Sequence, residues 1–205
     1  MQPLHARRKR GLLVNTPAHL LIGAAVWGRQ RSRGVIMAAF AGALLPDLSL
    51  YLMAGVSLFL LSIPPQIVFD ELYFSDAWQT VFAIDNSFIL WGLLLGGAIW
   101  RRAPWAVALT GAAFLHLCLD FPLHHDDGRP HFWPLSGWVF ESPFSYWDRD
   151  HGAMWLAPIE GAAASAAAVI LWQQRLGVVL GAFVAILLLA ELWIVRQWLF
   201  FFIDA

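Results

Sequence analysis

Long runs of apolar residues constrain the fold of this chain more than any other feature. Residues 176–201 contain only two charged residues, Glu191 and Arg196, and residues 103–119 contain none. A run of about 20 apolar residues is long enough for a helix to cross a bilayer. Other apolar runs cover residues 17–27, 35–45, 48–61, 87–100 and 153–172. The pattern predicts an all-α, polytopic integral membrane bundle with about five or six apolar helices.

The composition supports this fold class and excludes one kind of partner. Hydrophobic residues make up 60% of the 205 residues and charged residues 13%, whereas soluble domains carry about 25% charged residues. A net charge of -1 excludes the basic face of a nucleic-acid-binding protein, so we expect membrane lipids as partners. The domain organisation we expect is a basic arm over residues 1–14 and one membrane-embedded domain over residues 15–205, with outward loops at 62–86 and 122–152.

A histidine-rich stretch carries most of the chemistry. Residues 116–131 contain four histidines and three aspartates. His116 and Asp120 are spaced i, i+4, so both leave one helix face, and one further turn reaches His124. These side chains are ligands for divalent metals. The alternative is a hydrogen-bonded pair that only fixes helix packing, but a charge near hydrocarbon costs roughly 3 kcal/mol or more, which favours a metal site.

A second pair of ligand-type residues is predicted to meet at one end of a helical hairpin. The short basic turn over residues 28–34 joins two apolar runs, the second of which ends at Pro46 and Asp47. His19 and Asp47 lie at similar distances from the middle of this turn. Antiparallel arms of equal length place both side chains at the same end.

Several further residues are candidates for catalysis or for a second ligand group. Asp85 precedes an apolar helix, where a carboxylate either caps the helix N-terminus or takes part in catalysis. His124 and His125 are placed for a second ion or a substrate phosphate. The alternative for both histidines is a solvated acidic loop.

Three acidic or imidazole side chains near the following helix complete the candidate set. Asp148 and His151 are spaced i, i+3 immediately before the apolar run at 153–172. Glu160 lies two turns into that run, at membrane depth, so we expect it to have a partner such as a histidine or the ion itself. All three are additional site candidates.

The distribution of charge predicts an orientation. Basic turns alternate along the chain with the two acidic loops; their residues are Arg29, Arg31, Arg33, Arg101, Arg102 and Arg175. The positive-inside rule places such turns in the cytoplasm. The histidine and aspartate cluster then faces the opposite side, which is the periplasm in a bacterium. The basic N-terminal arm does not fit this scheme, so either the first helix is re-entrant or the arm crosses the membrane.

Short motifs in a fixed order resemble a known family. They are AHLL at residues 18–21, LLPD at 44–47, NS at 86–87 before an apolar helix, and HLCLD at 116–120 leading to Trp133-Pro134. Together they resemble the bacterial inner-membrane-associated metal-dependent hydrolases, which are distantly similar to zinc-dependent phospholipases C. The resemblance covers roughly residues 15–134. It implies that His19, Asp47, His116 and Asp120 are metal ligands.

The chain departs from the family pattern at two places. Ser49 stands where the family has a second acid after Pro-Asp, and Asp85-Asn86-Ser87 stands where the family has Thr-His-Ser. Asp85 is a candidate to replace the absent histidine, as are His124, His125 and His151. The chain is therefore expected to be a divergent branch, with a site that is either rebuilt or inactive.

These features lead to one functional expectation and two alternatives. The expectation is metal-dependent hydrolysis with one or two zinc ions on His19, Asp47, His116 and Asp120, and with Asp85 or His124 taking a proton. The substrate expected is lipid-linked or amphiphilic, with a phosphodiester as first choice by family analogy. The alternatives are a non-enzymatic protein that binds or moves a metal ion or protons, and a structural protein with a vestigial site.

Overall fold

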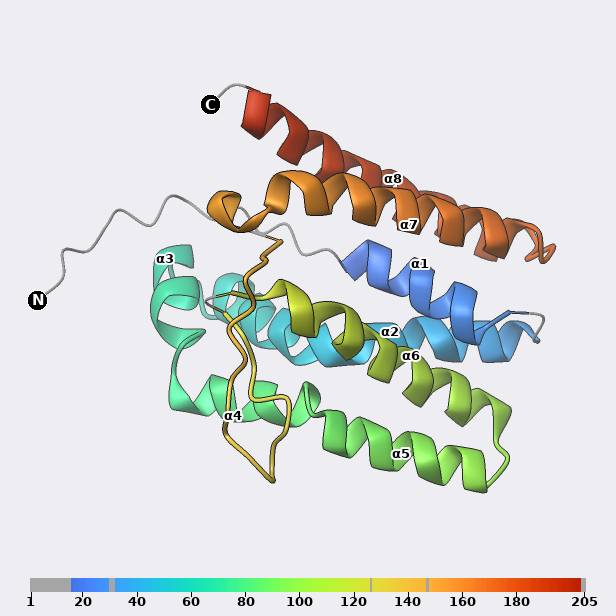
Figure 1. The fold of residues 1–205 in the computed structure, drawn as a ribbon, viewed down its shortest axis with the longest axis horizontal. Coiled ribbons are helices and arrows are strands. Elements are labelled where there is room, and N and C mark those ends of the chain that lie inside the picture. The colour runs from blue at the N-terminus through green and yellow to red at the C-terminus, as the bar shows by residue number, and fades with distance from the viewer. Residues whose placement is uncertain (1–15, 30–31, 126, 147, 204–205) are drawn as a thin grey trace, which may run out of the picture.

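The computed structural model describes residues 16–29, 32–125, 127–146 and 148–203, which form a helical bundle without any β-strand (Figure 1). Its main helices are α1 Thr16–Trp27, α2 Arg33–Gly55, α5 Phe88–Trp100, α6 Pro104–Asp120, α7 Ala153–Trp172 and α8 Val178–Ile203. Shorter segments are η1 Val56–Leu60, α3 Pro65–Ile67, η2 Val68–Leu72, α4 Asp76–Asp85, η3 Phe121–Leu123 and η4 Arg149–His151. Five helical segments are long and apolar enough to cross a membrane, and α1 is a shorter apolar helix. The predicted all-α membrane bundle is confirmed.

The two ends of the bundle differ in chemistry. The turns α1–α2, α5–α6 and α7–α8 all lie at one end (Figure 1), and they carry Arg29, Arg101, Arg102 and Arg175. The long irregular connection between η3 and η4 lies at the other end, with the start of α1 and the end of α6. The predicted Arg31 and the basic arm at residues 1–14 lie outside the described residues.

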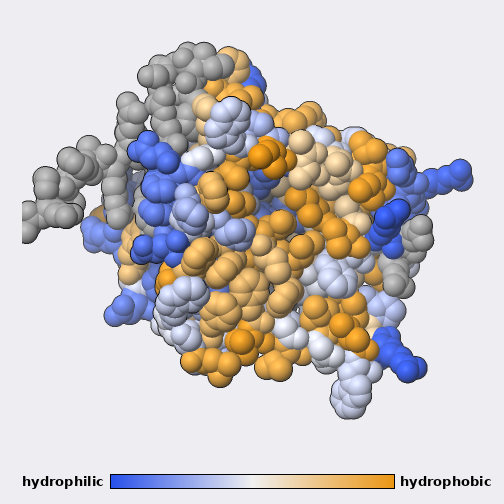
Figure 2. Space-filling model, viewed as in Figure 1, coloured by the Kyte–Doolittle hydropathy of each residue, from blue (hydrophilic) through white to orange (hydrophobic). Residues whose placement is uncertain are grey.

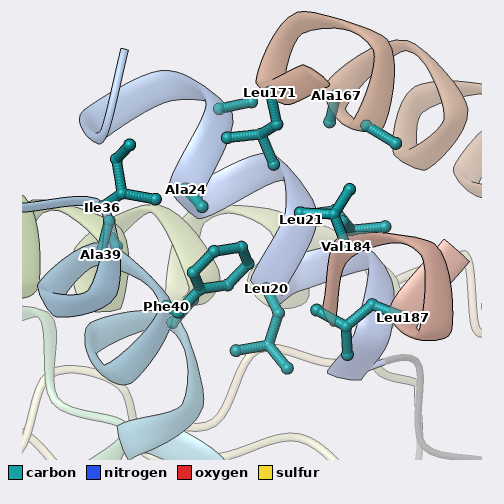
Figure 3. Packing of buried hydrophobic residues seen from close by; sticks show 14 of the residues in the cluster. Leu20, Leu21, Ala24, Ile36, Ala39, Phe40, Ala167, Leu171, Val184 and Leu187 are labelled. Carbon is teal, nitrogen blue, oxygen red and sulfur yellow. The ribbon is translucent and has the colours of Figure 1, made fainter. Parts of the chain in front are cut away.

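Helix α1 lies at the centre of the bundle. It packs against α2, α6, α7 and α8. Buried side chains from these helices meet around it, among them Leu21 of α1, Phe40 of α2, Leu171 of α7 and Val184 of α8 (Figure 3). Many of the other core residues are alanines, and small side chains let helix backbones approach closely. This close packing brings α1, α2 and α6 near enough for their polar residues to touch.

The outer surface fits a membrane environment. Large hydrophobic side chains stand fully out of the bundle, with Phe59, Trp100, Val178 and Val179 each 78% or more exposed. In the view of Figure 2, hydrophobic side chains cover the middle of the face and hydrophilic ones gather at its two ends. A soluble protein rarely exposes apolar area on this scale. The chain is therefore an integral membrane protein.

Two segments differ from the sequence-based expectation. The apolar run predicted to end at Pro46 instead continues as α2 to Gly55 and then as η1. Proline removes one helix hydrogen bond, but Pro46 is buried in the bundle, and an unwound backbone would leave more polar groups unpaired in hydrocarbon. The segment 62–86, predicted as a loop with room for a surface helix, contains α3, η2 and α4, and α4 leads into α5 as one apolar span.

Candidate metal centre

Three of the four predicted ligands lie together where α1 and α6 cross. The Asp120 carboxylate contacts both imidazoles. Its Oδ1 lies 3.0 Å from His19 Nε2, and its Oδ2 lies 3.0 Å from His116 Nε2. The two imidazole rings stack with centroids 4.3 Å apart. One ligand atom from each of the three residues lies within 4.8 Å of the others, an arrangement that could hold a metal ion. The i, i+4 spacing of His116 and Asp120 thus gives the geometry expected of it.

Asp47 forms the fourth side of this cluster. Its Oδ1 lies 3.7 Å from His116 Nε2. Its Oδ2 accepts a hydrogen bond of 2.6 Å from the hydroxyl of Thr16, which also contacts the hydroxyl of Tyr51. One carboxylate oxygen therefore faces the cluster while the other is held in place by α1. The predicted convergence of His19 and Asp47 at one end of the hairpin is observed.

A close helix crossing positions Asp47 against His116. A Cβ atom added to Gly42 of α2 would overlap the backbone carbonyl of Leu109 in α6, so only glycine permits this approach. One residue later, the carbonyl oxygen of Ala43 lies 2.7 Å from His116 Nδ1. This contact ties the imidazole of α6 to the backbone of α2.

The hydrogen bond at Nδ1 of His116 defines the state of its second ring nitrogen, Nε2. A backbone carbonyl only accepts hydrogen bonds, so Nδ1 carries the proton and the neutral ring presents a lone pair at Nε2. That lone pair faces the Asp120 and Asp47 carboxylates. Lone pairs facing carboxylate oxygens at this distance require a proton or a cation between them. Histidine with its second nitrogen anchored in this way is the common arrangement in metal sites.

Both rings are enclosed by protein. His19 is 4% exposed and His116 1% exposed, and Nδ1 of His19 has no hydrogen-bond partner among the described residues. The two rings stack on each other away from solvent. A set of imidazole nitrogens and carboxylate oxygens fits zinc and similar divalent ions.

His124 and Tyr146 line the outer rim of the cluster. His124 Nε2 lies 3.8 Å from Asp120 Oδ2, and its Nδ1 lies 2.9 Å from Asp127 Oδ1. Burial lowers the pKa of His124, but Asp127 and Asp120 outweigh it and raise that pKa to about 10. The ring of Tyr146 stands edge-on to His19 and His124, with centroids 6.3 Å and 5.9 Å away. Burial raises the pKa of its hydroxyl, and Asp120 raises it further.

Asp85 is not part of the cluster. Its carboxylate faces Ser49 of α2, and the N-cap of α5 is Ser87, whose Oγ accepts from the Leu90 amide at 3.1 Å. Asp85 therefore does not cap α5. The neighbouring Asn86 is buried and donates to the carbonyl oxygens of Phe82 and Pro46. The two departures from the family pattern, Ser49 and Asp85-Asn86, thus lie against each other beside Pro46.

Another pair of predicted residues meets outside this cluster. His125 and His151 stack on each other with centroids 3.6 Å apart, and Asp148 binds His151. Glu160 of α7 is buried. Glu191 of α8 is fully buried and lies against the backbone of Ala18 in α1.

Sequence reasoning missed the residues that orient the ligands. Thr16 and Tyr51 hold Asp47, Asp127 holds His124, and Tyr146 covers both His19 and His124. Tyr51 lies one helical turn after Asp47, so the i, i+4 spacing was a usable signal. The position of Tyr146 had no such signal, because it lies in irregular backbone.

Comparison of the chain with family models, with curated proteins and with solved structures finds no match. The motif pieces quoted from the sequence do lie close together. Ser87 donates its hydroxyl to the carbonyl oxygen of Trp133, Asn86 reaches Pro46, and the HLCLD segment supplies His116 and Asp120. The chemistry of this centre is the basis for assigning a function.

Proposed function

We propose that this protein is a membrane-bound metal-dependent hydrolase that acts on a lipid-linked or amphiphilic substrate, with a phosphodiester as the first choice. The observation that carries the proposal is the buried set of His19, His116 and Asp120, with Asp47 beside it. A purely structural polar pair would need neither a second stacked imidazole nor a second carboxylate. The resemblance to inner-membrane metal-dependent hydrolases supports the same assignment.

The donor set fits one divalent ion, most simply zinc. His19, His116 and Asp120 would hold it, and Asp47 lies close enough to complete the set. When bound, such an ion supplies Lewis acidity that activates water and polarises an ester oxygen. A second ion has less support here, because Ser49 and Asn86 stand where the family has an acid and a histidine.

The remaining residues of the centre orient groups and exchange protons. Thr16 fixes Asp47, and the carbonyl of Ala43 fixes His116. His124 lies on the outer side of Asp120, held by Asp127, where it can exchange a proton with water or with a leaving group. Asp85 is a weaker candidate for this role, because its carboxylate faces Ser49.

The position of the centre supports a membrane-derived substrate. It lies at the end of the bundle opposite the arginine-bearing turns, which by the positive-inside rule supports a position on the non-cytoplasmic side, the periplasm of a bacterium. Exposed aromatic and aliphatic side chains surround this end, including Leu135, Trp138 and Trp155 at 55% exposure or more. Tryptophan favours the membrane interface, where headgroups and ester bonds lie.

Metal content is the decisive measurement. Protein purified in mild detergent is compared by elemental analysis with a His116→Ala/Asp120→Ala variant and with Glu141→Ala, which removes an exposed carboxylate outside the cluster. We expect zinc or manganese in the wild type and in Glu141→Ala, and one equivalent less in the double variant. Hydrolysis of bis(p-nitrophenyl) phosphate and of a fluorescent phospholipid is then measured on the same three proteins.

The outcomes separate the proposals. Metal-dependent hydrolysis that disappears in the double variant supports the hydrolase. A wild type without metal, beside a double variant that melts at the same temperature, would overturn it and leave a structural protein. Metal without hydrolysis of any ester offered would point to the second candidate below.

A non-enzymatic protein that moves a metal ion or protons is the second candidate. The buried acids Glu160 and Glu191 favour it, because both exert an electrostatic effect on Tyr146, which covers His19. A path from the centre into the bundle would require such groups. Flux of zinc or protons in proteoliposomes, reduced by Glu191→Gln, would support this candidate, and hydrolysis unaffected by Glu191→Gln would count against a role for Glu191 in catalysis.

A further inference from the structure

A second histidine pair lies on the outer loop, away from the centre described above. The rings of His125 and His151 stack with centroids 3.6 Å apart and planes at 21°. His125 lies near the start of the irregular connection between η3 and η4, and His151 ends η4 just before α7. The pair therefore joins residues 26 positions apart in the chain.

Hydrogen bonds define the tautomer of both rings. His125 Nδ1 lies 2.7 Å from the carbonyl oxygen of Ser142, and His151 Nδ1 lies 2.8 Å from Asp148 Oδ2. A carbonyl and a carboxylate only accept hydrogen bonds, so each Nδ1 carries the proton. Each neutral ring then presents a lone pair at Nε2. Among the described residues, neither Nε2 has a hydrogen-bond partner.

The supporting contacts are themselves held by backbone. The other oxygen of Asp148 accepts from the amide of Asp150 at 2.9 Å. The Ser142 amide donates to the carbonyl of His124 at 3.0 Å, and the Ser145 amide donates to the carbonyl of His151 at 2.9 Å. These bonds link the segments that carry the two histidines. Ser142 and Asp148, which orient the two rings through Nδ1, are thus themselves held by backbone hydrogen bonds.

We propose that His125 and His151 form a second, surface-accessible site for a divalent transition metal such as zinc, nickel or copper. In protein metal sites, an imidazole commonly donates from one nitrogen to a carboxylate or carbonyl and binds the metal through the other. Imidazole nitrogens suit these three metals. The side chain of His151 is 30% exposed and that of Asp148 36%, so an ion can enter from water, and water can fill the remaining coordination positions.

Binding one ion with both nitrogens requires the two rings to turn. A metal lies in the plane of each imidazole it binds, about 2.0–2.1 Å from the nitrogen for zinc. Rings whose planes are only 21° apart at a centroid distance of 3.6 Å therefore have to open to a much larger angle about their side-chain bonds before one ion can lie in both planes. The site does not depend on the centre at His19, His116 and Asp120, since it uses neither those residues nor Asp47.

The test measures metal binding with the first centre removed. Tag-free protein in mild detergent, stripped with a chelator, is titrated with Zn²⁺ by calorimetry in four forms: wild type, His116→Ala/Asp120→Ala, His125→Ala/His151→Ala, and Asp148→Asn. We expect the first double variant to retain one equivalent of Zn²⁺ and the second to lose that equivalent. Asp148→Asn should weaken this binding about 10- to 100-fold, the usual cost of losing a carboxylate that orients a ligating histidine.

Copper provides an independent readout that does not need altered loop residues. Cu²⁺ added to the His116→Ala/Asp120→Ala protein should give electron paramagnetic resonance coupling to two imidazole nitrogens. Coupling to fewer than two nitrogens would overturn the proposal. Unchanged Zn²⁺ stoichiometry and affinity in His125→Ala/His151→Ala would also overturn it, as would loss of all binding in folded His116→Ala/Asp120→Ala.

Discussion

His19 and His116 stack inside the helical bundle, whereas His125 and His151 stack on the loop that covers its end. The first pair is carried by helices that pack through small residues, and both rings are buried. The second pair is carried by irregular backbone joined by a few hydrogen bonds, and it is partly exposed. The same type of side chain is therefore held by the whole bundle in one pair and by a few local hydrogen bonds in the other. We expect the first pair to lose its geometry when the helices separate, and the second when the loop moves away from the bundle.

The largest effect is expected from a change that separates α2 from α6. Gly42→Ala puts a methyl group into the backbone carbonyl of Leu109, which cannot move without shifting the helix. We expect a loss of at least about 3 kcal/mol of stability, together with loss of metal at His116. Gly96→Ala is the matched control, since a Cβ there meets nothing within 4 Å. Thermal unfolding and metal content in detergent measure both, and equal melting temperatures for the two variants would contradict the crossing described.

Asp120→Asn should weaken metal binding at the His19 and His116 pair and leave the His125 and His151 pair unchanged. It removes the only carboxylate that contacts both His19 and His116 among the described ion pairs. We expect metal affinity at the first centre to fall by more than about 100-fold, beyond the loss typical of second-shell changes. The loop pair should keep its affinity. Zn²⁺ calorimetry on this variant and on exposed Asp70→Asn as control measures both classes of site, and a parallel loss at both pairs would show that they are coupled.

Mild acid should destabilise the loop that carries His131 before it destabilises the helical bundle. His131 is 3% exposed and packs between Phe88 and Phe121, and burial lowers its pKa to about 4. The unfolded chain, with a histidine pKa of about 6.5, then binds the proton more readily than the folded chain. Stability is complete above about pH 6.5 and falls as the pH drops toward 4, by about 2 kcal/mol between pH 7.5 and 5.

His131→Phe removes the titrating group while keeping a ring between Phe88 and Phe121. Its melting temperature should therefore change less than that of the wild type over the same pH range. Limited proteolysis should cut the loop of the wild type faster at pH 5 than at pH 7.5. If both proteins lose the same stability in acid, another group is responsible.

The smallest effect is expected from the residue that orients Asp47. Thr16→Val keeps the shape of the side chain but removes the hydroxyl that donates to Asp47 Oδ2. We expect metal affinity at the first centre to fall by about 10-fold, the low end for a second-shell partner. Thr80→Val is the control, because that hydroxyl is exposed and bonds only within α4. Equal affinities in the two variants would mean that Asp47 needs no support.

The same contrast explains what could be predicted from sequence. Helix periodicity placed His116 and Asp120 on one face, and the equal arms of a hairpin brought His19 and Asp47 to one end. Both inferences use regular geometry that spacing alone defines. The continuation of α2 through Pro46 was not predicted, because proline disfavours a helix locally. In a membrane, however, a helix is favoured since its backbone groups stay hydrogen-bonded.

The rest of the site depends on irregular backbone. The positions of Tyr146 and Asp127 follow from loop hydrogen bonds such as that from the Tyr146 amide to the carbonyl of Leu123, which no period predicts. Asp85 was predicted as a candidate site residue because it precedes Asn86 and Ser87 in the sequence. Consecutive residues at the end of a helix, however, point in different directions.

The length of α1 has a consequence for the charges near its start. Its 12 residues rise about 18 Å, while the hydrocarbon core of a bilayer is about 30 Å thick. The described part of α1 is therefore shorter than the hydrocarbon core, and Thr16 lies short of the level that α2 and α7 reach at this end of the bundle (Figure 1). Because α1 is enclosed by α2, α6, α7 and α8, lipid does not meet its end, and the longer helices shield the polar residues around Thr16 from hydrocarbon. Protein rather than lipid therefore surrounds the charges of Asp47 and Asp120, which would be costly in hydrocarbon.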